Sequence, residues 1–163
     1  MKTIFLLRHA KSSWNDPGLA DFDRPLNERG KKAAPFMGKL MQEKGFAPEI
    51  IVTSPAVRAR TTASLVKEAG RLAGPLTFEP AIYEASPQGI RQVVSELSDS
   101  IKSVLIVGHN PGMEGFIRYL TGRMEPMPTA ALAVIPMDID RWDNISEGCG
   151  TLQEVFRPRE AMK

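Results

Sequence analysis

Two arginines and two histidines are the side chains in this sequence best suited to do chemistry. Arg8 and His9 directly follow an apolar run near the start of the chain. Arg58 comes shortly after a second apolar run, and His109 shortly after a third. Arginine offers a planar fork that bonds two phosphate oxygens at once, and a neutral imidazole is a nucleophile near pH 7. Because these are the only two histidines of the chain, their shared position after apolar runs indicates a phosphoryl-binding site.

The apolar runs are predicted to be strands of a parallel sheet. The runs 4–7, 49–52 and 103–107 are short and continuous, as in strands that are buried on both faces. A fourth run at 131–135 is expected to be another strand, and 152–156 is expected to close the sheet in an antiparallel direction.

Helices are predicted between these strands. Three dipeptides, Ser54-Pro55, Ser86-Pro87 and Asn110-Pro111, each place a capping residue before a proline, which is typical of a helix N-terminus. A fourth helix is expected from Asn27 to Gly45, with a proline inside it that causes a kink or a late start. The alternation predicts an α/β fold, a three-layer α/β/α sandwich with a central, mostly parallel sheet, in a single domain over residues 1–163.

This arrangement would bring the four candidate residues together. Ligands of open α/β sheets bind at the carboxyl ends of the strands, where helix N-termini also favour anions. Arg8, His9, Arg58 and His109 are all expected at that edge. Arg60 would face elsewhere on the same helix as Arg58, and it is expected to be a solvated surface residue.

Composition narrows the possible functions. The 163 residues carry a formal net charge of +2 without a long basic run, so nucleic acid is not indicated as a partner. No stretch reaches the roughly 18 apolar residues of a membrane span, and a cytoplasmic protein without membrane contact is expected. Cys149 is the only cysteine, which excludes a disulfide within the chain.

Other phosphoryl-transfer classes fit less well. A cysteine phosphatase would need an arginine at position 155, which holds Val155, and a GxxxxGK loop is absent. Asp138 and Asp140 form an Asp-x-Asp motif of the kind in aspartyl-phosphate enzymes, but little chain follows to complete such a site. Two histidines and one cysteine do not make a zinc ligand set. A catalytically silent phosphate-binding module remains an alternative to an enzyme.

Three segments resemble the motifs of a known family. LLRHAKSSWN, VTSPAVRARTTA and LIVGHNPGMEGFI are similar, in that order, to the Arg-His-Gly, second-arginine and second-histidine motifs of the histidine phosphatase superfamily, which is phosphoglycerate mutase-like in fold. Together with DFDRPLNERG they most resemble the SixA-like phosphohistidine phosphatases. The resemblance covers residues 2 to about 156, and Ala10 replaces the more usual glycine.

The resemblance implies a role for each site residue. His9 would be the nucleophile and would form a phosphohistidine intermediate that water hydrolyses. Arg8, Arg58 and a protonated His109 would bind the phosphoryl oxygens, and Asn15 matches a pocket-lining position of larger relatives. Because arginines would neutralise the charge, no metal or other cofactor is expected.

The general acid and the substrate are less closely defined by the sequence. Glu84 is the one carboxylate in a place comparable to the acid of relatives that act on alcohol phosphates, and a solvated loop glutamate is an equal alternative. A departing imidazole needs little acid assistance, since its conjugate acid has a pKa of about 6.5. Few residues separate Arg58 from Glu84, so a lid over the site is not expected. A site that is open in this way could admit a phosphohistidine on a partner protein such as a phosphotransfer domain. Small phosphate esters are the alternative substrates.

Overall fold

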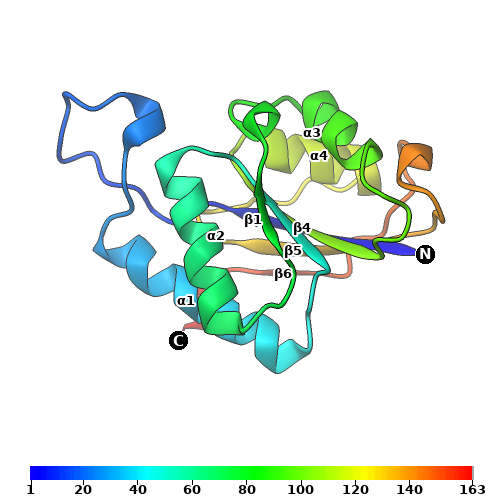
Figure 1. Ribbon diagram of the computed structural model, residues 1–163, viewed down its shortest axis with the longest axis horizontal. Helices are drawn as coiled ribbons and strands as arrows, with labels where there is room; N and C mark the ends of the chain where they lie inside the picture. Colours follow the sequence, from blue (N-terminus) through cyan, green and yellow to red (C-terminus); the bar gives the residue numbers. More distant parts are fainter. Residues whose placement is uncertain (163) are drawn as a thin grey trace.

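A six-stranded sheet forms the centre of the computed structural model, which describes residues 1–162 (Figure 1). Its strands lie in the order β3-β2-β4-β1-β5-β6. The neighbours from β3 to β1 are parallel, whereas β5 is antiparallel to both β1 and β6. The predicted mostly parallel sheet is therefore confirmed. The strands are β1 Lys2–Arg8, β2 Ile50–Thr53, β3 Leu76–Phe78, β4 Ser103–Gly108, β5 Leu132–Met137 and β6 Glu154–Phe156.

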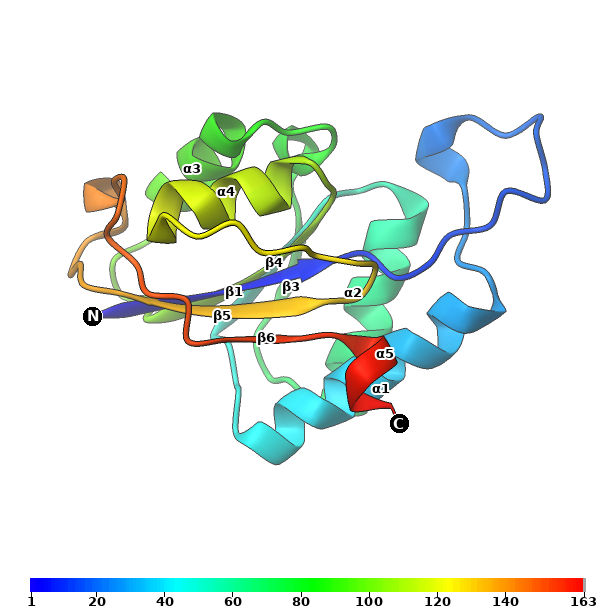
Figure 2. The same cartoon turned by 180° about the vertical axis from the view of Figure 1, so that it is seen from behind.

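Helices cover both faces of the sheet, which confirms the three-layer sandwich. One face carries α1 and α2 and the other carries α3 and α4, as both ribbon views show (Figures 1 and 2). The α-helices are α1 Glu28–Lys44, α2 Val57–Gly70, α3 Pro87–Ser95, α4 Gly112–Thr121 and α5 Pro158–Ala161. The 3-10 helices are η1 Asp21–Asp23, η2 Pro80–Ile82 and η3 Trp142–Asn144. None of the described helices is both long and apolar enough to cross a membrane.

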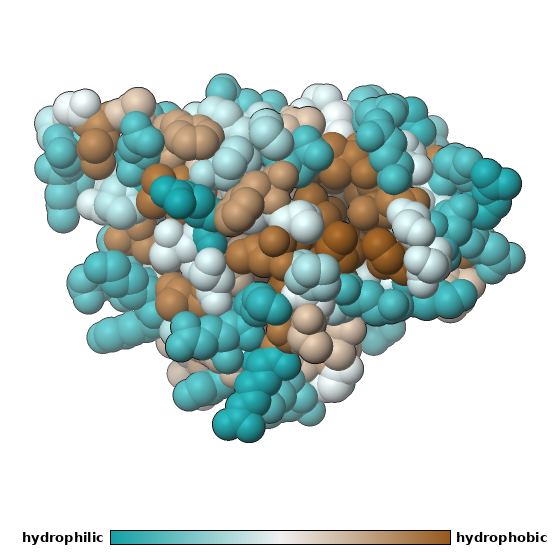
Figure 3. Space-filling view, viewed as in Figure 1, coloured by the Kyte–Doolittle hydropathy of each residue, from teal (hydrophilic) through white to brown (hydrophobic). Residues whose placement is uncertain are grey.

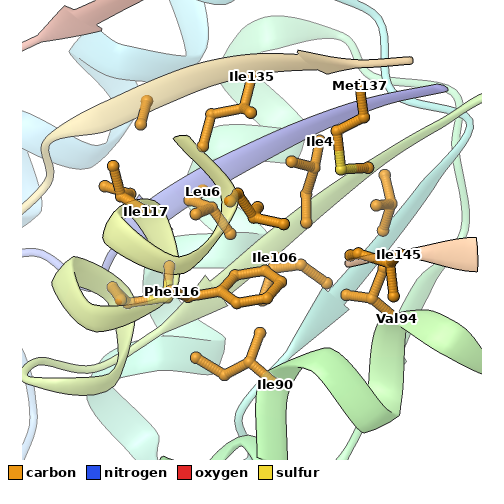
Figure 4. Packing of buried hydrophobic residues seen from close by; sticks show 14 of the residues in the cluster. Ile4, Leu6, Ile90, Val94, Ile106, Phe116, Ile117, Ile135, Met137 and Ile145 are labelled. Carbon is orange, nitrogen blue, oxygen red and sulfur yellow. The ribbon is translucent and has the colours of Figure 1, made fainter. Parts of the chain in front are cut away.

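Apolar side chains from the strands fill the space under both helix layers. Successive residues of a strand point to opposite faces, so Ile4 and Leu6 of β1 pack toward α3 and α4, while Phe5 and Leu7 pack toward α1 and α2. Figure 4 shows the first of these cores, in which Phe116 of α4 lies among isoleucines from strands and α3. Burial on both faces explains why the central strands are continuous apolar runs.

Two of the four predicted helix starts are confirmed, and two helices begin later than expected. Asn27 and Ser86 cap α1 and α3 by accepting hydrogen bonds from Gly30 N and Gly89 N. Ser54 does not cap α2, which begins at Val57, because the Ser54 hydroxyl contacts the N–H of Ala56 and a histidine ring instead.

The last predicted helix, α4, begins at Gly112, so Pro111 is not its first residue. Asn110 still accepts a hydrogen bond from Glu114 N at 3.3 Å. Strand β3 was not predicted. It has only three residues, of which two are exposed, so it carries no apolar run.

Residues 9–27, between β1 and α1, form a segment that projects from the body of the protein. In Figures 1 and 2 this segment, with η1 inside it, stands away from the sheet next to the carboxyl end of β1. Figure 3 shows apolar residues near the middle of the same view and further apolar residues at the upper left, where the projecting segment carries the exposed side chains of Trp14, Leu19 and Phe22. The projecting segment lies next to the sheet edge where a ligand site was predicted (Figure 1).

Candidate active site

The four predicted residues meet in one pocket at the carboxyl ends of β1 and β4. Arg8 ends β1 and is paired with Gly108 of β4, so His9 and His109 follow neighbouring strands. Their ring centroids lie 5.1 Å apart. Arg58, in the first turn of α2, reaches the same pocket, whose volume is about 350 Å³. The lining residues are Arg8, His9, Lys11, Ser12, Trp14, Arg24, Arg58, His109, Asn110 and Thr129.

The His9 ring is buried, neutral and held in one tautomer. Only 6% of the residue is exposed. Nδ1 donates to the carbonyl of Ala10 at 2.8 Å, so the lone pair of the neutral ring is on Nε2. Burial lowers the pKa of His9 to about 3, with a further contribution from the neighbouring cations. Ala10 is itself fixed, because its N–H donates to Thr62 Oγ1 of α2 at 2.9 Å.

Arg8 is held by the segment between α4 and β5. Its Nη1 donates to the carbonyl of Met127 at 3.1 Å. The same carbonyl accepts from Asn110 Nδ2 at 3.0 Å, and Glu114 Oε2 accepts from Met127 N at 3.1 Å. Glu114 of α4 thereby fixes the segment that orients Arg8.

Arg58 is held by a residue of the projecting segment. Its Nη1 donates to the carbonyl oxygen of Asp21 at 2.6 Å, and its Nη2 donates to Asp21 Oδ2 at 2.9 Å. Arg58 is buried, whereas Arg60 is exposed, as the helix geometry predicted.

The His109 ring is also neutral in this structure. Its Nε2 lies 2.8 Å from Ser54 Oγ. Burial, and to a smaller extent the Arg58 guanidinium, lower the pKa of His109 to about 4. Burial and the adjacent guanidinium both favour the neutral form of the ring, whereas the resemblance implied a protonated His109 that binds phosphoryl oxygens.

The pocket is rich in nitrogen atoms that have no hydrogen-bond partner. Among the described residues 1–162, the buried side-chain nitrogen and oxygen atoms without a hydrogen-bond partner are Arg8 Nε, Arg58 Nε and His109 Nδ1. All three belong to pocket-lining residues, and buried polar groups are rarely left unpaired. Every charged residue that lines the pocket is a lysine or an arginine. The arrangement therefore fits a tetrahedral oxyanion, whose oxygens would accept from these groups.

Two predicted site residues lie outside this pocket. Asn15 is exposed and lines an adjacent surface hollow. The asparagine that lines the pocket itself is Asn110. Asn15 was placed by likeness to larger relatives, but here the segment after Trp14 turns away from the sheet. Glu84 is exposed in the loop before α3 and is not among the pocket-lining residues.

Sequence reasoning missed the residues that support the site. Asp21, Arg24, Thr62, Tyr83 and Glu114 are not among the site residues that the sequence predicted. The sequence signal for these residues was the motif DFDRPLNERG, which contains both Asp21 and Arg24. The structure shows that Arg24 is buried.

Comparison with known proteins identifies the family. The model of the histidine phosphatase superfamily (branch 1) matches residues 4–88. The chain belongs to this superfamily. An uncharacterized protein of Mycobacterium tuberculosis is 29% identical over 164 residues, which cover 94% of this chain and 100% of that protein.

Solved structures of this superfamily share the fold. The chain resembles a protein of Agrobacterium tumefaciens assigned to the SixA phosphohistidine phosphatases, with 28% identity, a TM-score of 0.83, and coverage of 96% of this chain and 98% of that one. The protein histidine phosphatase SixA in complex with tungstate has a TM-score of 0.85 at 20% identity and covers 98% of this chain and 99% of that one. The predicted family and fold are thus confirmed, and together these findings support a histidine-type phosphatase.

Proposed function

We propose that this protein is a metal-independent phosphatase that acts in the cytoplasm on phosphohistidine carried by a partner protein, such as the phosphotransfer domain of a signalling relay. The observation that carries the proposal is the neutral, oriented ring of His9 in a pocket with three unpartnered nitrogen atoms. A nucleophile and a set of oxyanion donors are the two requirements of metal-free phosphoryl transfer.

The proposed reaction begins with attack by His9 on phosphorus. The Nε2 lone pair forms a new P–N bond as the P–N bond of the substrate breaks, and the leaving imidazole takes up a proton from solvent. Arg8, Arg58 and His109 would hold the three equatorial oxygens, where negative charge is spread in the transition state. Water would then attack the phosphorus of phospho-His9 and release inorganic phosphate and the free ring.

An incoming dianion would also change the protonation of His109. Negative charge close to an imidazole favours its charged form, so phosphoryl binding would raise the pKa of His109 from its low value in the pocket. His109 would in this way become a cationic donor only when the substrate is present.

Three features support phosphohistidine on a protein as the substrate. Trp14 lines the pocket and is 71% exposed, so the pocket opens to the surface at this point. Within the described chain, residues 71–86 form only β3, η2 and their connections, and no lid helix is inserted there. A carboxylic acid is also missing from the pocket lining, which suits the departure of an imidazole better than that of an alkoxide.

The proposal is tested by comparing substrates at equal enzyme concentration. Phosphohistidine protein, a small phosphoramidate and several phosphate monoesters would be offered to the wild type and to His9→Asn, and phosphate release would be followed. We expect the highest kcat/KM with the phosphohistidine protein, and no turnover by the variant. Preference for a sugar or glycerate phosphate would contradict the proposed substrate, and the absence of any turnover would favour a silent phosphate-binding module.

A matched pair of variants tests the role of the second arginine. Arg58→Ala should lower kcat by about 10²–10³-fold, the usual effect of removing an oxyanion donor. Arg60→Ala changes an exposed arginine on the same helix and should leave kcat unchanged. Equal effects of the two substitutions would contradict the assignment of Arg58.

A further inference from the structure

Asp21 connects three segments of the chain at the rim of the phosphoryl site. Its Oδ2 accepts from Arg58 Nη2 at 2.9 Å and from the Tyr83 hydroxyl at 2.7 Å. Its Oδ1 accepts from Nε and Nη2 of Arg24 at 3.2 and 3.1 Å. One carboxylate of the projecting segment thus holds two buried arginines and the hydroxyl next to η2.

These contacts decide which way the guanidinium of Arg58 faces. The group is planar, so fixing both Nη atoms also fixes the direction of the Nε–H. Asp21 accepts from both Nη atoms, one through its carbonyl and one through its carboxylate. Nε has no partner, and Nη1 and Nη2 each have a second N–H beyond the one given to Asp21. The contacts with Asp21 therefore fix the guanidinium and still leave N–H groups that can donate to phosphoryl oxygens.

Asp21 is not placed as a competitor for the phosphoryl group. It is absent from the residues that line the pocket, whereas Arg24 and Arg58 both line it. Its side chain is 50% exposed, and that of Arg58 is 7% exposed. The carboxylate therefore approaches Arg58 from the rim side, away from the cavity. It also stays ionised at neutral pH, since hydrogen bonds from Tyr83 and Arg58 lower the pKa of Asp21 to about 2.

We infer that Asp21 is a positioning residue, which holds the guanidinium of Arg58 in the orientation that binds the phosphoryl group. Tyr83 and Arg24 hold Asp21 in turn. The inference rests on the proposed role of Arg58 and adds the residue that makes that role possible. It assigns a function to the projecting segment, whose η1 helix carries Asp21.

The test measures tungstate binding by isothermal titration calorimetry, with kcat/KM for a small phosphoramidate as a second readout. Asp21→Asn keeps the shape of the side chain and removes its charge. We expect it to weaken tungstate binding and to lower kcat/KM by about 10- to 100-fold, the size expected for one hydrogen bond between charged groups. Asp23→Asn is the matched control, because Asp23 is exposed on the same η1 helix, and it should change neither value. Tyr83→Phe should act in the same direction as Asp21→Asn, by a smaller factor.

A double-mutant cycle separates positioning from a general structural role. If Asp21 acts through Arg58, then Asp21→Asn should have little further effect on the tungstate dissociation constant in an Arg58→Lys background. A full additional loss in that background would overturn the inference. Tighter tungstate binding by Asp21→Asn alone would also overturn it, because Asp21 would then be a competing anion.

The same titrations separate the other outcomes. A variant that is partly unfolded binds tungstate with a lower stoichiometry but an unchanged dissociation constant, and that result would also contradict positioning. Failure of the wild type to bind tungstate would remove the anion site of the proposed function, and this inference with it. Wild-type binding that Asp21→Asn leaves unchanged would refute the inference alone.

Discussion

Lowering the pH from 7 to 5 should destabilise this protein through its two histidines. An unfolded chain binds a proton on each imidazole near pH 6.5, whereas burial lowers the pKa of His9 to about 3 and that of His109 to about 4 in the folded chain. Between these values the unfolded state binds more protons, so stability falls as the pH falls. The loss integrates to about 2 kcal/mol for each ring between pH 7 and pH 5, or about 4 kcal/mol for both.

Urea unfolding at a series of pH values measures this loss directly. The buffers must be free of phosphate and sulfate, because an oxyanion in the pocket would change the protonation of His109. The single variants His9→Gln and His109→Gln should each remove about half of the pH dependence. The double variant contains no histidine and should be nearly flat between pH 7 and pH 5. Asp21 does not interfere, since its pKa falls from 3.8 to about 2 and its contribution is lost only at lower pH.

Nuclear magnetic resonance of the ring protons gives a second measurement of the same quantity. The wild type has only two histidine signals to follow, and neither should titrate above pH 5 in the folded protein. If the double variant lost as much stability as the wild type, or if His9 titrated near pH 6.5, the burial argument for a neutral nucleophile would be refuted.

Three further substitutions test the elements around the pocket. Thr62→Val removes the acceptor of the Ala10 N–H and should cost about 1–3 kcal/mol in urea unfolding as well as activity; unchanged stability would mean that this hydrogen bond does not hold the chain next to His9. Gly30→Ala would place a Cβ 2.2 Å from the carbonyl oxygen of Lys11. Such overpacking should lower the free energy of unfolding by about 1–3 kcal/mol. A variant as stable as the wild type would contradict the tight packing of α1 on the chain at Lys11. Glu84→Gln should leave phosphohistidine hydrolysis unchanged, and a large fall in kcat would restore Glu84 as the general acid.

The sheet, the helix layers and the four central side chains could be predicted because they are encoded locally. Continuous apolar runs mark strands that are buried on both faces, and the residue after such a run necessarily lies at the sheet edge. Arg8, His9 and His109 are brought together by strand order alone, since β1 and β4 are neighbours. The family resemblance supplied the same four residues independently.

The supporting contacts could not be predicted because they join distant parts of the chain. Asp21 and Arg58 are 37 positions apart, and Asp21 and Tyr83 are 62 apart. No local pattern reports such pairs. Ser54 was misassigned as a helix cap for the same reason: the ring that its hydroxyl contacts, His109, lies 55 positions further on. The protonation of His109 depends on burial, which sequence spacing does not reveal.

The neighbouring positions of β1 and β4 have a consequence for how such a protein can change its specificity. Adjacent strands are spaced about 4.8 Å apart by backbone hydrogen bonds, so the separation of the two histidine rings is set by the sheet and hardly depends on the surrounding loops. Exchange of the exposed residues 15–20, which leaves His9 and Asp21 in place, should therefore change the class of phosphorylated molecule that is accepted while the reaction centre stays intact. Laboratory grafts in this fold should begin with those six residues.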